Sequence, residues 1–427
     1  MKKYVFILLT ILFILISYII IGMVKKEQHI LLRDGKVKYN IIASGLKDAR
    51  DFSVNGDEVF IAFKNKIQVI EKSGKSYMLL EDNNLDIREL GYYNGNLYFL
   101  SGSSLFSLHV QDGKRSELMK DIPNYGDYEG GSILINNGML YLSIGAATNS
   151  GVVGEDNVWK DTYPFNYDIL PKDIVISEKV DSKFGAFVPY NTKNIPGQKI
   201  PGHFPGNSSV IIYNINKKNT SLFCWGLRNV NGMDYDSQGR IIATVGGMEP
   251  RGRRPVNGDV DYIYELKEGI WYGWPDYSGG DPINSPRFKG LNGEKLQFLL
   301  QKHPSSNPPA PLYQHKSLSS LSALAIDRNG ILGEKDCIYF YDNKDNILYS
   351  MSTSGVVSQK LRMDNNLKLK AIKSSEKGIM LLEQNDGYLL VIGNEEKTIN
   401  SNSNIIIIYT TGLIITIICI LVWKTKK

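Results

Sequence analysis

Six segments of the chain share one pattern, in which a turn residue precedes a short apolar strand rich in aromatic and β-branched residues. Val, Ile, Tyr and Phe favour a pleated, half-buried surface, and the leading Gly or Asp supplies a turn. Each segment is followed by a further apolar strand, as in a hairpin. The segments are GDEVFIAF from Gly56, GNLYFLS from Gly95, GMLYLSIG from Gly138, GRIIATVG from Gly239, DCIYFYD from Asp336 and GIMLLEQ from Gly378.

Four of the six copies follow a period of about 40 residues, which indicates a repeat of small antiparallel sheets. Such sheets bury their faces only against their neighbours, so a closed ring is favoured. The sequence therefore predicts an all-β, six-bladed β-propeller in which these segments are the inner strands. We expect the early strand near Ile41 to close the ring by joining the last blade. Two gaps, roughly 146–209 and 268–334, are predicted to be extended loops, with a seventh blade in the second as the alternative.

Both ends of the chain carry an uncharged apolar run, at residues 4–24 and 404–423. Each run has the roughly 20 residues that a helix needs to cross a bilayer. We predict two transmembrane helices flanking the propeller; a cleaved signal peptide is the alternative for the first. Lysines follow the second run directly, and positive charge stays on the cytoplasmic side.

This topology divides the chain into five parts. Residues 1–3 are expected to be cytoplasmic, 4–24 a transmembrane helix or signal anchor, 25–403 the extracytoplasmic propeller at the cell membrane, 404–423 the second helix and 424–427 a cytoplasmic tail. The formal net charge is +5, but seven lysines flank the spans, and without them the remainder carries −2. A nearly neutral domain has no electrostatic footprint for nucleic acid, so we expect no nucleic-acid partner.

One basic side chain, Arg228, lies beside Asn229 just before a strand that the pattern predicts to be buried. A lone buried charge is very costly, so the arginine must be paired or must face a ligand. In a propeller the loops at one end of the inner strands converge on the axis, which would put Arg228 at a funnel. Pairing with a nearby carboxylate such as Asp234 is the alternative. The basic run RGRR at 251–254 has two interpretations, a solvated face or a site for an anionic ligand or partner above the funnel.

The stretch CWGLRNVNGMDYDSQGRIIATVGG, followed by RGRRPVNGDVDYIYELKEGIWYGWPDYSGG, resembles the glucose/sorbosone dehydrogenase family. Supporting pieces include LYLSIGAATNSGVVGEDN and NDGYLLVI, so the resemblance covers roughly residues 40–393. Members of that family are six-bladed propellers that oxidise sugars with pyrroloquinoline quinone (PQQ) and calcium. The resemblance places Arg228, Asn229, Lys368 and Lys370 on cofactor-contacting positions. It places the backbone carbonyls of Gly247 and Met248 on the calcium.

The chain departs from the family where the chemistry is carried. Tyr128 stands at the position of the family's catalytic histidine, in DYEGGSIL, and Glu129 is a substitute carboxylate beside it; Asp127 completes this catalytic candidate set. Three further polar positions of the family motifs are changed, and they are occupied by Ser132, Ala146 and Gly246. Tyrosine, with a reference pKa near 10, is a poor base at neutral pH unless a cation depresses its pKa.

Three functions therefore remain open from the sequence. The first is a membrane-anchored, PQQ- and calcium-dependent sugar dehydrogenase. The second is a propeller that has lost catalysis and binds a carbohydrate or a protein partner at the cell surface. The third is a calcium-dependent lactonase, which would need several polar residues to meet at one funnel. The candidates for that third site are Asp127, Glu129, Asn149, Asp156 and Asp261.

Overall fold

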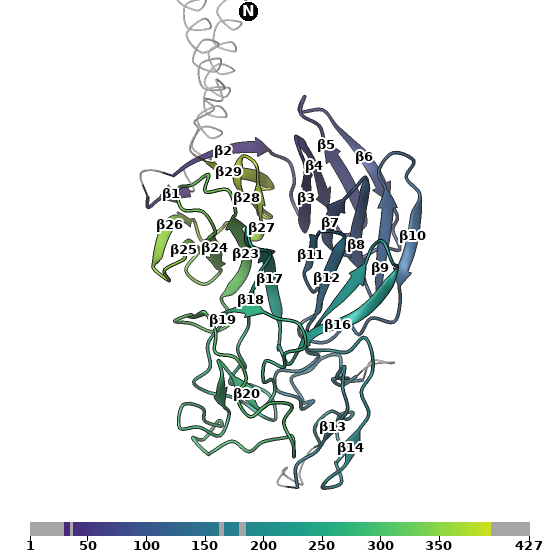
Figure 1. Ribbon diagram of the computed structural model, residues 1–427, viewed down its shortest axis with the longest axis vertical. Coiled ribbons are helices and arrows are strands. Elements are labelled where there is room, and N and C mark those ends of the chain that lie inside the picture. The colour runs from purple at the N-terminus through teal and green to yellow at the C-terminus, as the bar shows by residue number, and fades with distance from the viewer. Residues whose placement is uncertain (1–29, 35–36, 162–165, 179–184, 394–427) are drawn as a thin grey trace, which may run out of the picture.

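The computed structural model describes residues 30–34, 37–161, 166–178 and 185–393, and its regular elements are all strands. Six sheets of four or five strands form a ring, which Figure 1 shows with β13, β14 and β20 in long loops below it. The six-bladed propeller is confirmed. In the described ranges no helix is long and apolar enough to cross a bilayer. The two expected spans, 4–24 and 404–423, lie outside the described residues.

Each blade is an antiparallel sheet, and its strands are called first, second, third and fourth from the axis outward. Blade 1 has β3 (Asp51–Asn55), β4 (Glu58–Ala62), β5 (Lys66–Ile70) and β6 (Ser76–Glu81). Blade 2 has β7 (Ile87–Tyr93), β8 (Asn96–Ser101), β9 (Ser104–His109) and β10 (Arg115–Met119). Blade 3 has β11 (Ile133–Asn136), β12 (Met139–Ile144), β15 (Ser209–Asn214) and β16 (Asn219–Trp225). Blade 4 has β17 (Val230–Tyr235), β18 (Ile241–Val245), β19 (Tyr262–Leu266) and β22 (Tyr313–Gln314).

The last two blades include strands from the start of the described chain. Blade 5 has β23 (Leu321–Asp327), β24 (Cys337–Asp342), β25 (Ile347–Met351), β26 (Val357–Met363) and β1 (Ile30–Leu32). Blade 6 has β27 (Leu369–Ser375), β28 (Gly378–Glu383), β29 (Tyr388–Gly393) and β2 (Lys38–Ala43). The predicted closure is confirmed, because Ile41 on β2 pairs with Leu390 on β29. The short pairs β13 (Ile174–Val175) with β14 (Lys199–Ile200), and β20 (Tyr277–Ser278) with β21 (Asp281–Pro282), lie in the loops.

The assignment of inner strands is wrong by one strand in every blade. The six segments are the second strands, β4, β8, β12, β18, β24 and β28. The strands that contact one another around the axis are instead the first ones, β3, β7, β11, β17, β23 and β27. Second strands are the most apolar because both of their faces pack against neighbouring blades. First strands border the axis, where Asp51, Glu89 and Lys373 interrupt their apolar pattern.

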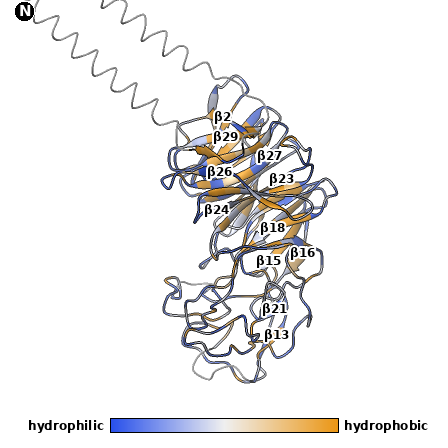
Figure 2. Cartoon of the chain, turned by 90° about the vertical axis from the view of Figure 1, so that its left-hand side faces the viewer, coloured by the Kyte–Doolittle hydropathy of each residue, from blue (hydrophilic) through white to orange (hydrophobic). Residues whose placement is uncertain are grey.

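Hydrophobic clusters fill the contacts between adjacent blades, as between β4 and β8 around Phe60 and Phe99. A further cluster lies within the two long loops, where Trp225, Trp271 and Trp274 pack with Phe187 and Phe288. Figure 2 shows hydrophobic strands in the propeller and mixed hydropathy in these loops. The loops therefore form a packed unit with an apolar core. The second loop region supplies β22 to blade 4 and β23 to blade 5, and its described residues form no seventh blade. Cys224 and Cys337 are both free and buried.

Gly378, at the start of β28, tests how tightly blade 6 is packed. Its φ is +127°, and a Cβ there would lie 1.9 Å from the carbonyl oxygen of Ile392. We expect Gly378→Ala to lower the free energy of unfolding by about 3 kcal/mol or more. Gly355 also has a positive φ, +85°, but a Cβ there meets open space among the described residues. Gly355→Ala should cost only about 1 kcal/mol; equal losses in urea titrations would contradict the packing argument.

Candidate functional site

The residues predicted from the sequence gather mainly at one end of the propeller, called here the mouth. All first strands begin at this end, so the segments that precede them meet there: Tyr128 before β11, Arg228 before β17 and Ser319 before β23. The connections from second to third strands return to the same end. These connections bring in Asn149, between β12 and β15, and Glu249, between β18 and β19.

Arg228 is enclosed by this mouth, with only 4% of its surface exposed. Its guanidinium carbon lies 4.2 Å from the centre of the Tyr128 ring, and Nη1 donates to the Tyr128 hydroxyl. The same nitrogen donates to Oδ1 of Asn149 at 2.8 Å and lies 3.8 Å from a carboxylate oxygen of Glu249. The Nε atom donates to the carbonyl of Gly246 at 3.2 Å. A buried arginine is tolerated when it is paired and hydrogen-bonded, and here the chain supplies every partner.

Arg251 covers this cluster from the side of the solvent. It donates to Asp127 at 2.7 Å, to Asp156 at 2.8 Å and to the Tyr128 hydroxyl at 2.9 Å. It also donates to Glu249, and the Glu249 carboxylate in turn accepts a hydrogen bond from the Tyr128 hydroxyl group at 3.0 Å. Arg228, Tyr128, Glu249 and Arg251 therefore form one continuous network, named here the mouth network.

The environment sets the protonation states within the mouth network. Burial raises the pKa of Tyr128 to about 12, so its phenol stays protonated at neutral pH. Burial alone would raise the pKa of Glu249, but Arg228, Ser319 and Arg251 outweigh it and lower that pKa to about 2. Glu249 is thus a firmly ionised partner for two arginines, and Tyr128 is a donor to it. Neither group is poised to accept a proton from a substrate near neutral pH.

The other two catalytic candidates are also engaged by the protein. Glu129 is exposed and forms an ion pair with Arg88 at 2.8 Å. Asp127 accepts hydrogen bonds from the side chains of Asn157, Trp159 and Arg251. All three candidates for the base therefore have partners within the chain.

The other three candidate cofactor residues take no part in the hydrogen bonds and ion pairs described for the mouth network. Asn229 is half-buried and donates to Asn231 at 2.5 Å, which leads toward the axis. The side chain of Lys368 is exposed, and Lys370 lines a cavity on the axis. Arg228 is paired within the chain, so it does not join the two lysines as a free cation. The alternative partner Asp234 binds Arg328 at 2.5 Å instead.

The basic run at 251–254 is neither a solvated face nor an open anion site. Arg253 pairs with Glu155 at 2.5 Å, and Arg254 is buried against Asp276 at 3.0 Å. These arginines fasten the long loops to one another. The charges that looked available in the sequence are therefore neutralised within the fold.

The two residues predicted for calcium, Gly247 and Met248, lie below the mouth network. The amide of Gly247 donates to Asp261 at 3.1 Å, and the amide of Met248 donates to Asp259 at 2.6 Å. Asp261 also binds three backbone amides at the start of β23, so it organises the backbone. Among the described residues no three His, Cys, Asp or Glu side chains cluster as metal ligands.

Some of the polar candidates do converge. Asp127 and Asp156 meet at Arg251, and Asn149 joins them through Glu249 and Arg228. The sequence missed Glu249, although it is the residue that unites the mouth network. Its partners Arg228 and Tyr128 lie about 20 and about 120 residues away in the sequence, and no local sequence pattern predicts contacts over such separations.

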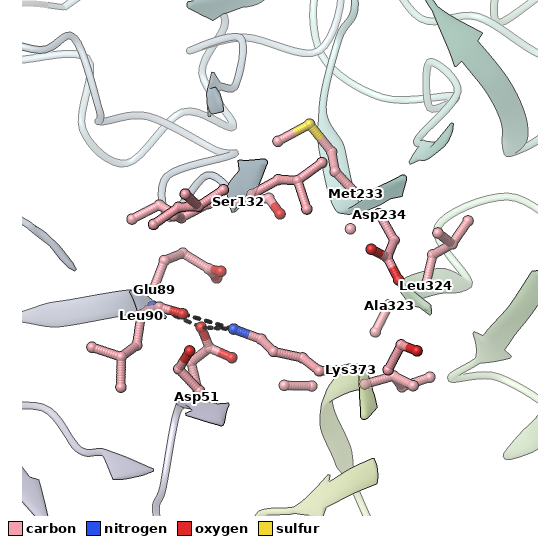
Figure 3. A pocket seen from close by; sticks show the side chains of 18 of the residues that line it. Asp51, Glu89, Leu90, Ser132, Met233, Asp234, Ala323, Leu324 and Lys373 are labelled. Carbon is pink, nitrogen blue, oxygen red and sulfur yellow. Dashed lines mark hydrogen bonds and ion pairs between the residues drawn. The ribbon is translucent and has the colours of Figure 1, made fainter. Parts of the chain in front are cut away.

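A second site, the axial cavity, encloses about 220 Å³ and is lined by residues of all six first strands. Figure 3 shows Asp51, Glu89 and Lys373 facing this space. Lys373 pairs with Asp51 at 2.8 Å and donates to the carbonyl of Leu90 at 2.7 Å. Burial raises the pKa of Glu89 to about 8, with the Asp51 carboxylate adding to the effect. The sequence signal for this cavity is the presence of charged residues among apolar ones in the segments IRELGYY and LKAIKSS.

No family model and no curated protein matches this sequence. Solved structures do resemble the fold. An enzyme of carbohydrate-active family AA12 from Trichoderma reesei has a TM-score of 0.58 at 13% identity, over 86% of this chain and 98% of its own. The holo PQQ domain of pyranose dehydrogenase from Coprinopsis cinerea has a TM-score of 0.55 at 11% identity, over 85% and 97%. PQQ-bound aldose sugar dehydrogenase from Streptomyces coelicolor gives 0.52 at 14%, over 84% and 99%. At these identities the likeness establishes a shared propeller fold.

Glu249→Gln tests the mouth network. A neutral amide cannot neutralise two arginines, so we expect the free energy of unfolding to fall by about 1–3 kcal/mol. Because the pKa of Glu249 is lowered from 4.5 to about 2 by folding, its contribution is complete above the unfolded pKa and is lost as pH falls between those values. In denaturant titrations at several pH values, the free energy of unfolding of the variant should therefore fall less than that of the parent as the pH drops through this interval. Glu265→Gln removes a surface pair with Lys267 and is the control, with a change within about 0.5 kcal/mol; equal losses would refute the network.

Glu89 should give a pH dependence of the opposite sign. Its pKa is raised from 4.5 in the unfolded chain to about 8 in the fold, so the folded state binds the extra proton between these values. Stability should therefore fall as pH rises from about 4.5 to about 8, and should level off above that. Glu89→Gln should remove this slope. A parent protein that gains stability over the same interval, with no difference in the variant, would contradict the assignment.

Proposed function

We propose that this chain is a binding propeller that keeps the scaffold of the quinoprotein sugar dehydrogenases without their redox chemistry. The observation that carries the proposal is the mouth network, in which Arg228 lies on the Tyr128 ring and is paired with Glu249. A cofactor-binding arginine must offer its charge to the ligand. Here that charge is already used by the chain.

The residues at the mouth do not fit PQQ. Its three carboxylates require cations that can be recruited, but Arg228 and Arg251 are bonded to carboxylates of the chain. Its flat ring system requires an open face, yet the guanidinium of Arg228 stands 4.2 Å above the Tyr128 ring. No ring fits between two groups at that separation, which is already close to van der Waals contact.

The residues at the mouth do not fit calcium or a sugar-oxidising base either. Asp127 and Asp156, the carboxylates nearest the network, are ligands of Arg251, so a cation would have to displace it. Oxidation of a sugar hydroxyl also needs a proton acceptor with a suitable pKa. Tyr128 stays protonated, Glu249 is too weak a base, and Glu129 is paired with Arg88. A lactonase would meet the same obstacle.

The ligand we propose is a polar, carbohydrate-like molecule, bound at the cell surface. The proposal of a surface location rests on the apolar runs at 4–24 and 404–423 and on their flanking lysines. The resemblance of the fold to sugar-oxidising propellers supports a carbohydrate as the ligand. This support is an analogy at the level of the fold.

The test uses the full-length protein purified in detergent, with calcium and PQQ added. We expect neither saturable PQQ binding, measured by equilibrium dialysis and absorbance, nor sugar-dependent reduction of a dye. An active aldose sugar dehydrogenase in the same detergent is the positive control. Saturable PQQ binding together with dye reduction would refute the binding-propeller proposal and establish the dehydrogenase. In that case Arg228→Ala should abolish both signals, while Arg240→Ala, which removes an exposed arginine from the β17–β18 turn, should leave them unchanged.

A further inference from the structure

The axial cavity is separate from the mouth network and is built from different residues. Its walls come from all six first strands. Its volume of about 220 Å³ is below the roughly 300–1,000 Å³ of pockets that take drug-sized ligands. Any ligand of this cavity must therefore be small.

The polar groups on the wall offer both donors and acceptors. Glu89 presents its carboxyl group to the space (Figure 3). The backbone amide of Ile133 donates a hydrogen bond to this carboxyl group. Ser132 presents a hydroxyl group from the segment before β11. Asp51 accepts the Leu90 amide and the Lys373 ammonium on Oδ2, and its Oδ1 takes part in neither bond.

Apolar side chains complete the wall opposite these groups. Met233 on β17 and Ala323 and Leu324 on β23 also line the space, and the side chains of Met233 and Leu324 extend from it into the hydrophobic clusters between the blades (Figure 3). A cavity with scattered donors and acceptors between apolar patches matches a molecule whose hydroxyl groups alternate with C–H faces. Water alone would leave the apolar patches without favourable contacts.

The charges that face the cavity largely cancel. Lys373 pairs with Asp51, and Arg328 pairs with Asp234. Arg50, at the rim, pairs with Asp86. Within the described part of the chain this leaves Lys370 and Glu89, which are of opposite type, together with the phenols of Tyr92 and Tyr235, as the remaining charged or titratable groups of the wall. The cavity therefore offers no strong field for an ion of either sign.

We infer that the axial cavity binds a small uncharged polyhydroxylated molecule, a monosaccharide or an alditol, through Glu89, Ser132 and the Asp51–Lys373 pair. The inference rests on the proposed binding function and places its ligand on the axis. Protonated Glu89 donates a hydrogen bond to a ligand hydroxyl, and ionised Glu89 accepts one. The groups that bias this choice are Asp51, Lys370 and Lys373, with Asp234 and Arg328 on the far wall.

Calorimetric titration of the full-length protein with D-glucose, sorbitol and myo-inositol tests the inference. We expect saturable binding of at least one of them. Ala323→Leu fills the cavity and should weaken this binding by about tenfold or more. Ala323→Ser keeps the space and should bind as the parent does.

Glu89 provides a second test that does not depend on filling the cavity. Glu89→Ala should weaken binding by about tenfold, whereas Glu89→Gln should keep binding and lose its dependence on pH between about pH 6 and about pH 9. Glu117→Gln, on the outer strand β10, is the matched control and should behave as the parent does. If Ala323→Leu does not fold, the two Glu89 variants decide the outcome.

Four results would overturn the inference. The first is the absence of a heat of binding with any of the three polyols, and the second is polyol binding that persists unchanged in both Ala323→Leu and Glu89→Ala. The third is polyol binding by Glu89→Gln that still depends on pH. The fourth is binding of methylammonium or calcium in place of the polyols. These results leave the binding-propeller proposal standing when PQQ gives no dye reduction. Dye reduction with PQQ overturns that proposal whatever the calorimetry shows.

Discussion

The pairing of β2 with β29 is the interaction on which the rest of the structure depends. Residues 38–43 join residues 388–393, so that the last blade contains both ends of the propeller. Without this pairing blade 6 would keep an unpaired edge, and the ring of six first strands would not be closed by backbone hydrogen bonds. The axial cavity and the mouth both exist only in the closed ring, because each is assembled from several blades.

The sequence predicted the fold because its evidence is local and repeated. A turn followed by an apolar strand recurs in every blade, and each copy is visible without knowledge of its neighbours. The same reasoning misplaced the inner strands, since it selected the strands with the most uniform apolar pattern. Those strands are buried on both faces, while β3, β7 and β27 carry Asp51, Glu89 and Lys373 toward the axis. Charged residues within a strand indicate an inner position in this fold. In the sequence the same residues make the apolar strand pattern less regular, so these strands were not selected.

The candidate site was less predictable, because its chemistry depends on contacts between distant segments. The sequence identified Arg228 and Tyr128 as unusual, and both lie at the mouth. It could not show that Glu249, from the loop after β18, reaches both of them. Whether an arginine binds a ligand or a carboxylate of its own chain is decided by that loop. The altered catalytic motif around Tyr128 and the paired charges of the mouth network therefore belong to the same group of contacts.

The strand β1 has a mechanical consequence. It adds a fifth strand to blade 5 through only three residue pairs, Ile30–Met363, Leu31–Arg362 and Leu32–Leu361, and a short segment later the same chain becomes β2 in blade 6. Tension applied to the chain ahead of residue 30 would therefore act first on these three pairs and only afterwards on the strand that closes the ring. Because β1 is not one of the strands that close the ring, the loss of its three pairs would leave the pairing of β2 with β29 in place.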